Sequence, residues 1–565
     1  MESQTKSCQN CKKEFTIESE DFDFYTKIKV PAPTFCPECR LQRRLAFFNL
    51  IHLYKNTCGL CKKDTISVYS PDSGYIVYCP KCWWSDRWDP LSYGREYDFS
   101  RNFFEQFNEL MHEVPHLALT IEPSASETSP FTNYAGSLKN CYLAFNAERN
   151  ENVVNGGYIF DSHTILDSSL VMNSERSYDS MHIYKVNNGI GLRNQVTESF
   201  DVSFLRDCVN CQNCFGSANL RNKKYYFFNQ LLSKDDYKKR LEEIDLGSYK
   251  TYQEIKTKTQ EHWDSLPHKS SYIDMSVNCT GNLIFESKNC KNSFEILHCQ
   301  NSRYISMLRN TKDSYDITSW SDIELSYDSL AVGQFAHNVK FSAIGAINGS
   351  DMDYSFLTIN GVGFFGCVSI KKGKYCILNK AYSKDEFFEM RKKIIEHMQS
   401  NIYHDSRGLS YAYGEFFPIE FSPWTYNDTV AQRIFPLTEI QAKEKGYGWI
   451  DKKDTGYAIT KEVADIPDHI RDIPDSFVKE VFCCASCGKG YKVTSMEVTL
   501  LRNMNLPFPR TCPFCRIEEK LDIWFSESKL MKKLCNLCDK EIHTPSSLKD
   551  KKIIYCEACY QKEII

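Results

Sequence analysis

Eight C-x-x-C pairs limit what this chain can fold into more than any other feature of its sequence. Of the 26 cysteines, sixteen lie in eight such pairs near the two ends of the chain. Two such pairs together present four thiolates to one ion, which is the ligand set of a closed structural zinc site. We therefore predict four zinc ions, with no ligand position left open to a substrate. The predicted ligands are Cys8, Cys11, Cys36, Cys39, Cys58, Cys61, Cys79, Cys82, Cys484, Cys487, Cys512, Cys515, Cys535, Cys538, Cys556 and Cys559.

The spacing of the pairs indicates that one two-zinc module is present twice. The interval between the two pairs of the first site is the same in both copies, and so is the shorter interval between the two pairs of the second site. The phrase "VPAPTFCPECR" (30–40) returns 476 positions later as "LPFPRTCPFCR" (506–516). A duplication explains the shared spacing and the shared phrase together. We predict that the two copies occupy residues 1–90 and 481–565.

In each copy, the second pair of the first site runs directly into a helix-like stretch, as in "CRLQRRLAFFNLI". Free N–H groups in the first turn of a helix can donate to thiolates, and the helix dipole favours their negative charge. This arrangement is typical of a treble clef finger, whereas the shorter second site resembles a zinc ribbon. We interpret the metal as the element that holds these modules together, because they are too small to fold without it.

Between the modules, a phrase of serine, aromatic residue and acid recurs, as in "SYDS" at 177 and "SYDI" at 314. Its spacing indicates coils of about 21 residues, which is typical of a parallel β-solenoid. Alternation with period two would bury the aromatic residues and expose the acids. The expected inward residues are Phe200, Phe294, Tyr315 and Tyr327. The expected outward acids are Asp179, Asp201, Glu295, Asp316 and Asp328.

A longer repeat marks the ends of two such stretches. The segment "LRNKKYYFFNQLLSKDDY" (220–237) returns 150 positions later as "IKKGKYCILNKAYSKDEF". Ser233 and Ser383 each precede an acid by three residues, which predicts a capped helix that covers the last strand edge. The predicted fold class is a multidomain α+β chain with a central parallel β-solenoid in two stretches, flanked by the duplicated modules. Between the modules we expect a helical connector (91–129), a first solenoid stretch with its capping helix (130–245), a helical linker (246–270), a second stretch with its capping helix (271–400) and an irregular, proline-punctuated connector (401–480).

Composition and charge favour a soluble protein. The formal net charge is −4, the isoelectric point is near 6.4, and no polybasic tail is present. The start of the chain, "MESQTKSCQN", lacks the apolar core of a signal peptide, and no apolar run approaches the ~20 residues of a membrane span. Paired cysteines without an export signal suit a reducing compartment. We expect a cytoplasmic protein that makes no membrane contact.

Several longer segments carry a resemblance to a known family. They are "WWSDRWDPLSYGREYDFSRNFFEQF" (83–107), "CPECRLQRRL", "GEFFPIEFSPWTYND" (414–428) and the terminal C-x-x-C modules. Together they resemble an uncharacterised family of multi-zinc-finger proteins with a central β-solenoid, predicted from small-genome bacteria. The likeness runs along most of the chain. It implies no activity, because none is established for that family.

The sequence favours a non-catalytic zinc-binding scaffold or interaction protein whose partner is another protein. It contains no nucleophile motif, phosphate-binding glycine loop or H-E-x-x-H motif. Two alternatives stay open. Nucleic acid could bind to the helix that carries Arg40, Arg43 and Arg44, with nearby aromatic residues stacking on bases. Carbohydrate could instead bind along the outward acids, as in β-solenoid enzymes.

A third set of cysteines lies outside the pairs near the chain ends. In "CVNCQNC", Cys208, Cys211 and Cys214 have a spacing that some iron–sulfur sites use. The alternative is that they are small residues stacked at the corners of the solenoid, where neighbouring repeats carry Ser or Asn.

Overall fold

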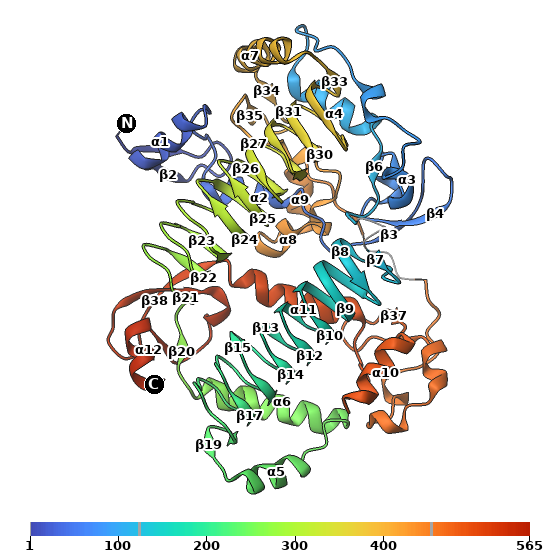
Figure 1. Cartoon of the computed structure of the whole chain (residues 1–565), viewed down its shortest axis with the longest axis vertical. Helices are drawn as coiled ribbons and strands as arrows, with labels where there is room; N and C mark the ends of the chain where they lie inside the picture. The colour runs from blue at the N-terminus through green and yellow to red at the C-terminus, as the bar shows by residue number, and fades with distance from the viewer. Residues whose placement is uncertain (1, 122–125, 452–455, 565) are drawn as a thin grey trace. The chain divides into compact units, whose positions relative to one another are not determined.

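Most strands of the protein pair in parallel with an equivalent segment of the chain, which lies one short repeat later in the sequence. A computed structural model, which describes residues 2–121, 126–451 and 456–564, arranges these strands in two large sheets (Figure 1). In one sheet His163 pairs with Glu175, and Glu175 pairs with Asn187. In the other, Ser306 pairs with Thr318. The chain therefore returns to the same place after a repeat that is little more than half as long as the predicted coil.

The chain divides into two units of mixed α/β structure, and each unit contains one of the sheets. Unit 1 comprises Met1–Leu119, Ser271–Ile450 and Glu527–Leu530, and unit 2 comprises Thr120–Ser270, Asp451–Ser526 and Met531–Ile565. The N-terminal cysteine-rich segment thus belongs with the second sheet along the chain, and the C-terminal one belongs with the first. The sequence did not predict this crossed assignment.

The sheet of unit 2 runs from β7 to β19. Its order along the main path is β15-β13-β11-β9-β10-β12-β14-β16-β17-β18-β19, with β8 pairing with β7 and β9. The strands are β7 (Ser126–Glu127), β8 (Asn133–Lys139), β9 (Tyr142–Phe160), β10 (His163–Leu166), β11 (Ser169–Met172), β12 (Glu175–Tyr178), β13 (Met181–Tyr184), β14 (Asn187–Ile190), β15 (Val196–Thr197), β16 (Phe200–Ser203), β17 (Gln212–Phe215), β18 (Tyr226–Phe227) and β19 (Gln230–Leu231).

The sheet of unit 1 runs from β21 to β33 and is built in the same way. Its strands are β21 (Ile273–Asp274), β22 (Gly281–Phe285), β23 (Ser293–Leu297), β24 (Ser306–Lys312), β25 (Tyr315–Glu324), β26 (Tyr327–Val332), β27 (Ala336–Lys340), β28 (Ala343–Ile347), β29 (Ser350–Asp353), β30 (Phe356–Ile359), β31 (Gly361–Phe365), β32 (Gly373–Ile377) and β33 (Lys380–Ala381). In both sheets the described strand pairs are parallel except for the final hairpin.

A left-handed residue at every third position explains the repeat. In unit 2, positive φ angles recur at Thr164, Asp167, Leu170 and Asn173. Asn and Asp tolerate this conformation better than most residues with a Cβ atom, which accounts for their abundance in the middle of the chain. One side chain in each group of three points into the core, and the inward positions along this segment are Ile165, Ser168, Val171 and Ser174. Four such groups of three make one repeat.

The three-residue period corrects the predicted alternation of period two. Phe200 is 42% exposed rather than inward-facing, and Phe294 is only half-buried. Two of the acids that we expected in solvent, Asp316 and Asp328, are instead completely buried. Because the chain bends at every third residue, successive side chains do not alternate between two faces.

Tyr315 and Tyr327 are buried, but they do not point into the interior of the repeat as predicted. They take the same position in the three-residue period as Phe200, and a helix outside the repeat covers them. Phe24 lies on α1 (Ser19–Lys27), and its ring stacks on Tyr315 with the ring centroids 3.9 Å apart. Tyr25 packs edge-on against Tyr327. These tyrosines are therefore part of the surface on which the N-terminal segment packs within unit 1.

The longer repeat, in which segment 220–237 returns at 370–387, forms equivalent ends of the two sheets. Each sheet ends in an antiparallel hairpin, β18–β19 or β32–β33. Asn229 and Asn379 occupy the same place in these hairpins. Each side-chain amide forms two hydrogen bonds with the backbone of one residue in the preceding repeat: it accepts from the N–H group and donates to the C=O group. Ser233 and Ser383 then cap α5 (Lys234–Glu242) and α7 (Lys384–Ser400), as predicted.

The remaining helices support these sheets. In α4 (Phe103–Glu113) the apolar face, including Phe107 and Leu110, is buried. A capping box of Thr438 and Gln441 begins α9 (Glu439–Glu444). The others are α2 (Pro37–Leu45), α3 (Pro80–Trp83), α6 (Tyr249–Asp264), α8 (Val430–Ile434), α10 (Ser495–Asn503), α11 (Pro513–Ser526) and α12 (Glu557–Ile564). Among the described helices, none combines the length and apolar composition that crossing a bilayer would require.

Candidate metal centres

The sixteen paired cysteines come together as four groups of four. Within each group, the Sγ atoms all lie within 4.8 Å of one another, and the groups match the predicted pairs. A tetrahedral ion with metal–sulfur bonds of about 2.3 Å separates its sulfur ligands by about 3.8 Å. Three of the groups give Sγ–Sγ distances of 3.7 Å (Cys11–Cys36), 3.9 Å (Cys487–Cys512) and 3.8 Å (Cys538–Cys556). The four groups therefore have the ligand number, chemistry and spacing of a tetrahedral metal site.

All four groups are built from the same local parts. The first pair of each group lies at the turn of a short hairpin, and the second pair lies at the start of a helix. The hairpins are β1 (Gln4–Ser7) with β2 (Glu14–Ile17), β3 (Tyr54–Thr57) with β4 (Asp64–Ser67), β36 (Phe482–Cys483) with β37 (Gly490–Tyr491), and β38 (Leu530–Leu534) with β39 (Glu541–Pro545). The helices are α2, α3, α11 and α12. The ribbon-like expectation for the second site of each copy did not include α3 or α12.

Backbone N–H groups at the helix starts point at the sulfur atoms. Cys36 N donates to Cys8 Sγ at 3.3 Å, and Cys512 N donates to Cys484 Sγ at 3.1 Å. The second site of each copy repeats this bond, at 3.3 Å in both cases. Such donors favour the thiolate, which is the form that binds a metal.

The pKa values of the hairpin cysteines reflect this environment. Burial opposes ionisation of Cys58, but the backbone N–H groups of Cys61 and Cys79 outweigh it and lower the pKa to about 6. The same balance of burial against backbone donors lowers the pKa of Cys535 to about 6 and that of Cys484 to about 7. At least one thiol of each of these sites is therefore prepared to ionise near neutral pH.

The structure places Arg40, Arg43 and Arg44 inside unit 1, which corrects the expectation of an exposed phosphate-binding row. All three side chains are at most 2% exposed. Arg40 pairs with Asp316 at 2.8 Å, and Arg44 pairs with Asp328 at 2.7 Å. Burial works against the charge of Arg40, but the Asp316 carboxylate outweighs it and raises the pKa of Arg40 above its ordinary value.

Arg43 completes this cluster, which we call the N-terminal ion cluster. It pairs with Asp328 and with Glu415, both at 2.9 Å. Three arginines thus meet Asp316, Asp328 and Glu415, and the cluster is neutral as a whole. Because the cationic groups are buried and matched by acids, a nucleic acid has no access to them in this conformation.

The C-terminal module forms an equivalent cluster in unit 2, which we call the C-terminal ion cluster. Arg516 of α11 lies 476 positions after Arg40 and pairs with Asp167 at 2.6 Å and with Glu497 at 2.8 Å. Lys520, which corresponds to Arg44, pairs with Asp179 at 2.6 Å. Burial favours the neutral form of Asp179, but its basic neighbours reverse this and hold its pKa well below its usual range.

The aspartates of both clusters lie one repeat apart on their sheets. The sequence separation of Asp316 and Asp328 equals that of Asp167 and Asp179. All four have positive φ angles between 39° and 57°, so each occupies a corner position of the three-residue period. The sequence reasoning identified three of these acids but placed them in solvent, and it missed Asp167. The signal available in the sequence was the equal spacing of the two pairs of acids, together with a basic residue directly after a C-x-x-C pair.

The predicted column of exposed acids is therefore interrupted. Asp179, Asp316 and Asp328 are buried in ion pairs, whereas Asp201 is exposed and accepts a hydrogen bond from Asn188 at 2.8 Å. An acidic face of the kind that a carbohydrate enzyme would use is not formed by these residues.

Among the described residues, the four cysteine groups with the spacing of a metal site do not include Cys208, Cys211 or Cys214. All three are buried and take inward positions of the repeat in unit 2. The Sγ atom of Cys208 lies 3.4 Å from the carbonyl oxygen of the residue two positions earlier. Inward serines such as Ser168 donate in the same way. The structure therefore favours the interpretation of these cysteines as small corner residues.

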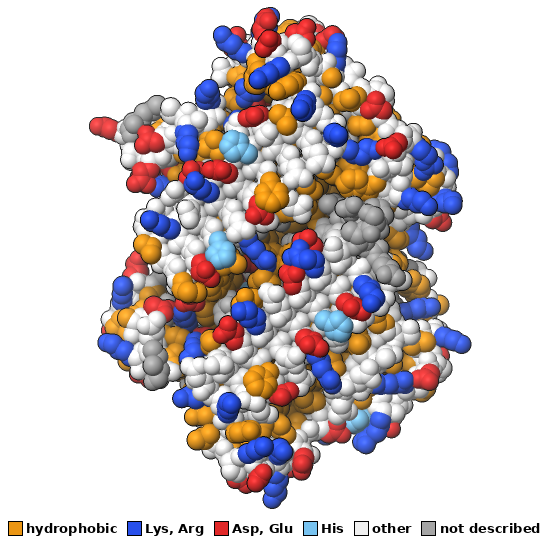
Figure 2. Space-filling model, in the orientation of Figure 1, with side chains coloured by type: hydrophobic (Ala, Val, Ile, Leu, Met, Phe, Trp, Pro, Cys, Tyr) orange, Lys and Arg blue, Asp and Glu red, His pale blue; other side chains and the backbone are white. Residues whose placement is uncertain are grey.

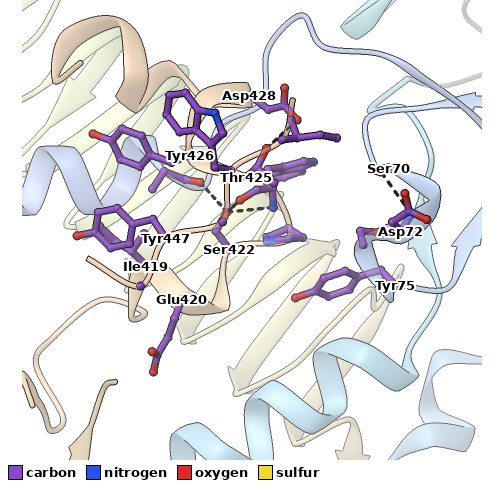
Figure 3. A pocket seen from close by; sticks show the side chains of 18 of the residues that line it. Ser70, Asp72, Tyr75, Ile419, Glu420, Ser422, Thr425, Tyr426, Asp428 and Tyr447 are labelled. Carbon is purple, nitrogen blue, oxygen red and sulfur yellow. Dashed lines mark hydrogen bonds between the residues drawn. The ribbon is translucent and has the colours of Figure 1, made fainter. Parts of the chain in front are cut away.

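Unit 1 also contains a cavity of about 420 Å³ (Figure 3). It lies between the loop around Asp72 and the segment 419–450, and none of the sixteen paired cysteines lines it. Neighbouring hydroxyl groups hold two of the acids that line it. Tyr403 donates to Glu420 at 2.6 Å, and Tyr54 donates to Asp428. These acids therefore help to fix the loops that form the cavity wall.

One face of the molecule mixes charges of both signs. On the face shown in Figure 2, Lys and Arg side chains alternate with Asp and Glu side chains, and hydrophobic side chains are scattered between them. Single-sign patches that attract nucleic acid through its phosphates have a different pattern.

The resemblance to a family rests on sequence motifs alone, since neither a scan of protein-family models nor a comparison with curated proteins finds a match for this chain.

Proposed function

We propose that this protein is a zinc-binding, non-catalytic scaffold in which four structural zinc ions hold two terminal modules. The observation that carries the proposal is the geometry of the four cysteine groups, whose sulfur atoms have tetrahedral spacing and fill every ligand position. Four thiolates satisfy a zinc ion completely, so no position remains for a reacting water or substrate. When bound, the ion cross-links a hairpin to a helix start in each site.

The second part of the proposal is that each large sheet is a parallel β-solenoid. Support comes from the parallel pairing of strands in successive short repeats, together with the left-handed corner at every third residue. Stacked repeats of this kind make a rigid, elongated support whose stability comes from neighbouring repeats. A rigid support with metal-held modules suits a protein that binds other proteins.

A reducing compartment such as the cytoplasm fits this function. All 26 cysteines are free thiols in the structure. Persistent free thiols and thiolate–zinc sites are typical of proteins kept in reducing conditions. Protein is the proposed partner class, because the arginines that would favour nucleic acid are paired in the N-terminal ion cluster.

Metal analysis tests the proposal directly. Protein expressed with ample zinc is measured by elemental analysis and by native mass spectrometry, and we expect four zinc ions per chain. Replacing Cys11, Cys61, Cys487 or Cys538 by Ser, one at a time, should remove one ion in each case. Two or fewer ions in the unmodified protein, or iron in place of zinc, would refute the proposal. A pull-down from native lysate with and without nuclease then separates protein partners from nucleic acid.

A further inference from the structure

The helix that completes the first metal site in each module also carries the basic residues of the ion cluster. In unit 1, Cys36 is the N-cap of α2 and Cys39 lies in its first turn. Arg40 follows Cys39 directly, and Arg44 lies one helical turn further on. The same turn of helix therefore supplies two metal ligands and the first buried guanidinium.

Unit 2 repeats this construction with the same residue positions. Cys512 and Cys515 flank the start of α11, Arg516 follows directly, and Lys520 lies one turn further on. In both units the helix inserts its charges between two acids that are one repeat apart on the sheet. The two copies share the metal ligands and the ion pairs although many of their other residues differ.

Buried ion pairs of this kind depend strictly on geometry. Taking charges out of water is costly, and their mutual attraction repays that cost only when the partners are well aligned. Helix α2 has 9 residues, and a helix of this length is marginal in water by itself. The alignment of Arg40 and Arg44 therefore depends on what holds the start of the helix, and the metal ligands hold it there.

We propose that the metal ion at the first site of each module acts as a latch: its occupancy keeps the helix docked in the ion cluster, and its loss releases the module from the sheet. This inference rests on the proposed function, since it requires metal at the four cysteine groups. On release, the charged groups regain water, which removes the cost of keeping misaligned charges buried. The module and the corner acids of the sheet then become accessible together.

The second metal site of unit 1 provides the matched control. Its helix α3 carries Trp83 directly after Cys82, and no residue of α3 belongs to the N-terminal ion cluster. Loss of this metal should therefore leave the cluster closed. The variants Cys11→Ser and Cys61→Ser differ only in which site they empty, and both leave the sequence of α2 unchanged.

Hydrogen exchange of the full chain, read by mass spectrometry, tests the latch. In Cys11→Ser we expect exchange at least tenfold faster than in the unmodified protein, both in α2 and in strands β25 and β26, which carry Asp316 and Asp328. In Cys61→Ser these segments should exchange as in the unmodified protein. Native mass spectrometry of the same samples should find four ions in the unmodified protein and three in each variant.

The outcomes separate the latch from the function on which it rests. Unchanged exchange in Cys11→Ser, with three ions bound, would overturn the latch and leave the zinc scaffold standing. Equal opening in both variants would also overturn it, because the effect would then be general. Two or fewer ions in the unmodified protein, or iron in place of zinc, would refute the proposed function itself.

A reciprocal experiment keeps the inference testable if Cys11→Ser fails to fold. Coupling between two sites acts equally in both directions, so weakening the ion cluster should weaken metal retention at the first site. In Asp328→Asn, with all sixteen cysteines intact, we expect one of the four ions to be lost to a chelator at least tenfold faster. Asp351→Asn changes an exposed corner acid of the same sheet and should lose its ions at the unmodified rate. Identical rates in the two variants would overturn the latch.

Discussion

Arg516 lies 2.6 Å from Asp167 in unit 2, and Arg40, 476 positions earlier, lies 2.8 Å from Asp316 in unit 1. Each arginine follows a C-x-x-C pair, and each acid occupies a left-handed corner of a parallel repeat. The duplicated phrase near the two chain ends therefore marks a docking element as well as a metal site. The arginine that both copies share faces an acid inside its own unit.

Removing one acid from the N-terminal ion cluster should strongly destabilise unit 1. Asp328 contacts both Arg43 and Arg44, so Asp328→Asn leaves two buried guanidinium groups without part of their counter-charge. We expect a loss of about 3–5 kcal/mol in the free energy of unfolding, as for other broken buried pairs. Urea denaturation, followed by hydrogen exchange of peptides from unit 1, measures it. Asp351→Asn, at an exposed corner, should change stability by less than about 0.5 kcal/mol.

The arginines of this cluster should not determine nucleic-acid affinity. Arg43→Gln removes a charge that is 1% exposed, so we expect lower stability of unit 1 and an unchanged salt dependence of binding to labelled RNA and DNA. A phosphate contact on duplex DNA would change the slope of log affinity against log salt by about 0.9. Fluorescence anisotropy at two salt concentrations makes the comparison. A reduced slope in a folded variant would show that Arg43 contacts phosphate.

His116 should make the stability of unit 1 depend on pH. It is completely buried, its Nε2 lies 2.6 Å from the carbonyl oxygen of Met111, and burial lowers its pKa to about 4. The unfolded chain binds a proton below about pH 6.5, whereas the folded chain does not until about pH 4, so stability falls as the pH falls through this window.

At pH 5 this difference amounts to about 2 kcal/mol relative to neutral pH. Urea denaturation at pH 7 and pH 5 should show this loss in the unmodified protein. His116→Gln removes the titrating group. In this variant the free energies of unfolding at pH 7 and pH 5 should therefore differ by about 2 kcal/mol less than they do in the unmodified protein. The same pH dependence in both proteins would show that His116 is not responsible.

The three-residue period can be tested at a single exposed corner. Asn310 has a φ of 51°, and its amide donates to Asp322 at 2.9 Å. A β-branched residue is strained in this conformation, so Asn310→Val should destabilise unit 1 by about 1–2 kcal/mol or more. Asn310→Gly loses the same hydrogen bond without the strain and should be milder. Equal effects of the two substitutions would contradict the assignment of position 310 to a corner.

The sequence alone was sufficient to find the four cysteine groups and the ends of the repeats. Ligand spacing is a local property, because a C-x-x-C turn brings its two sulfur atoms together wherever it occurs, and the duplication showed which pairs belong together. The capping residues Ser233 and Ser383 were predictable for the same reason. Each acts on backbone groups within a few residues.

The course of the repeat was harder to derive. The recurring serine, aromatic residue and acid suggested an alternation of two, but the structure bends at every third residue, and this left Phe200 exposed and buried Asp316. A sequence pattern shows which residues recur. It does not show the sign of φ at each of them, on which the inward direction of a side chain depends.

Only the tertiary structure determined which charged side chains are buried and which partners they have. Arg40 and Asp316 are 276 positions apart, and a basic helix reads the same in sequence whether it faces water or a buried acid. Their pairing depends on the N-terminal module packing on the sheet of residues 271–382, with the intervening sheet in another unit. Burial and pairing are properties of two surfaces brought together. The sequence of either surface alone therefore could not distinguish a docking helix from a nucleic-acid-binding one.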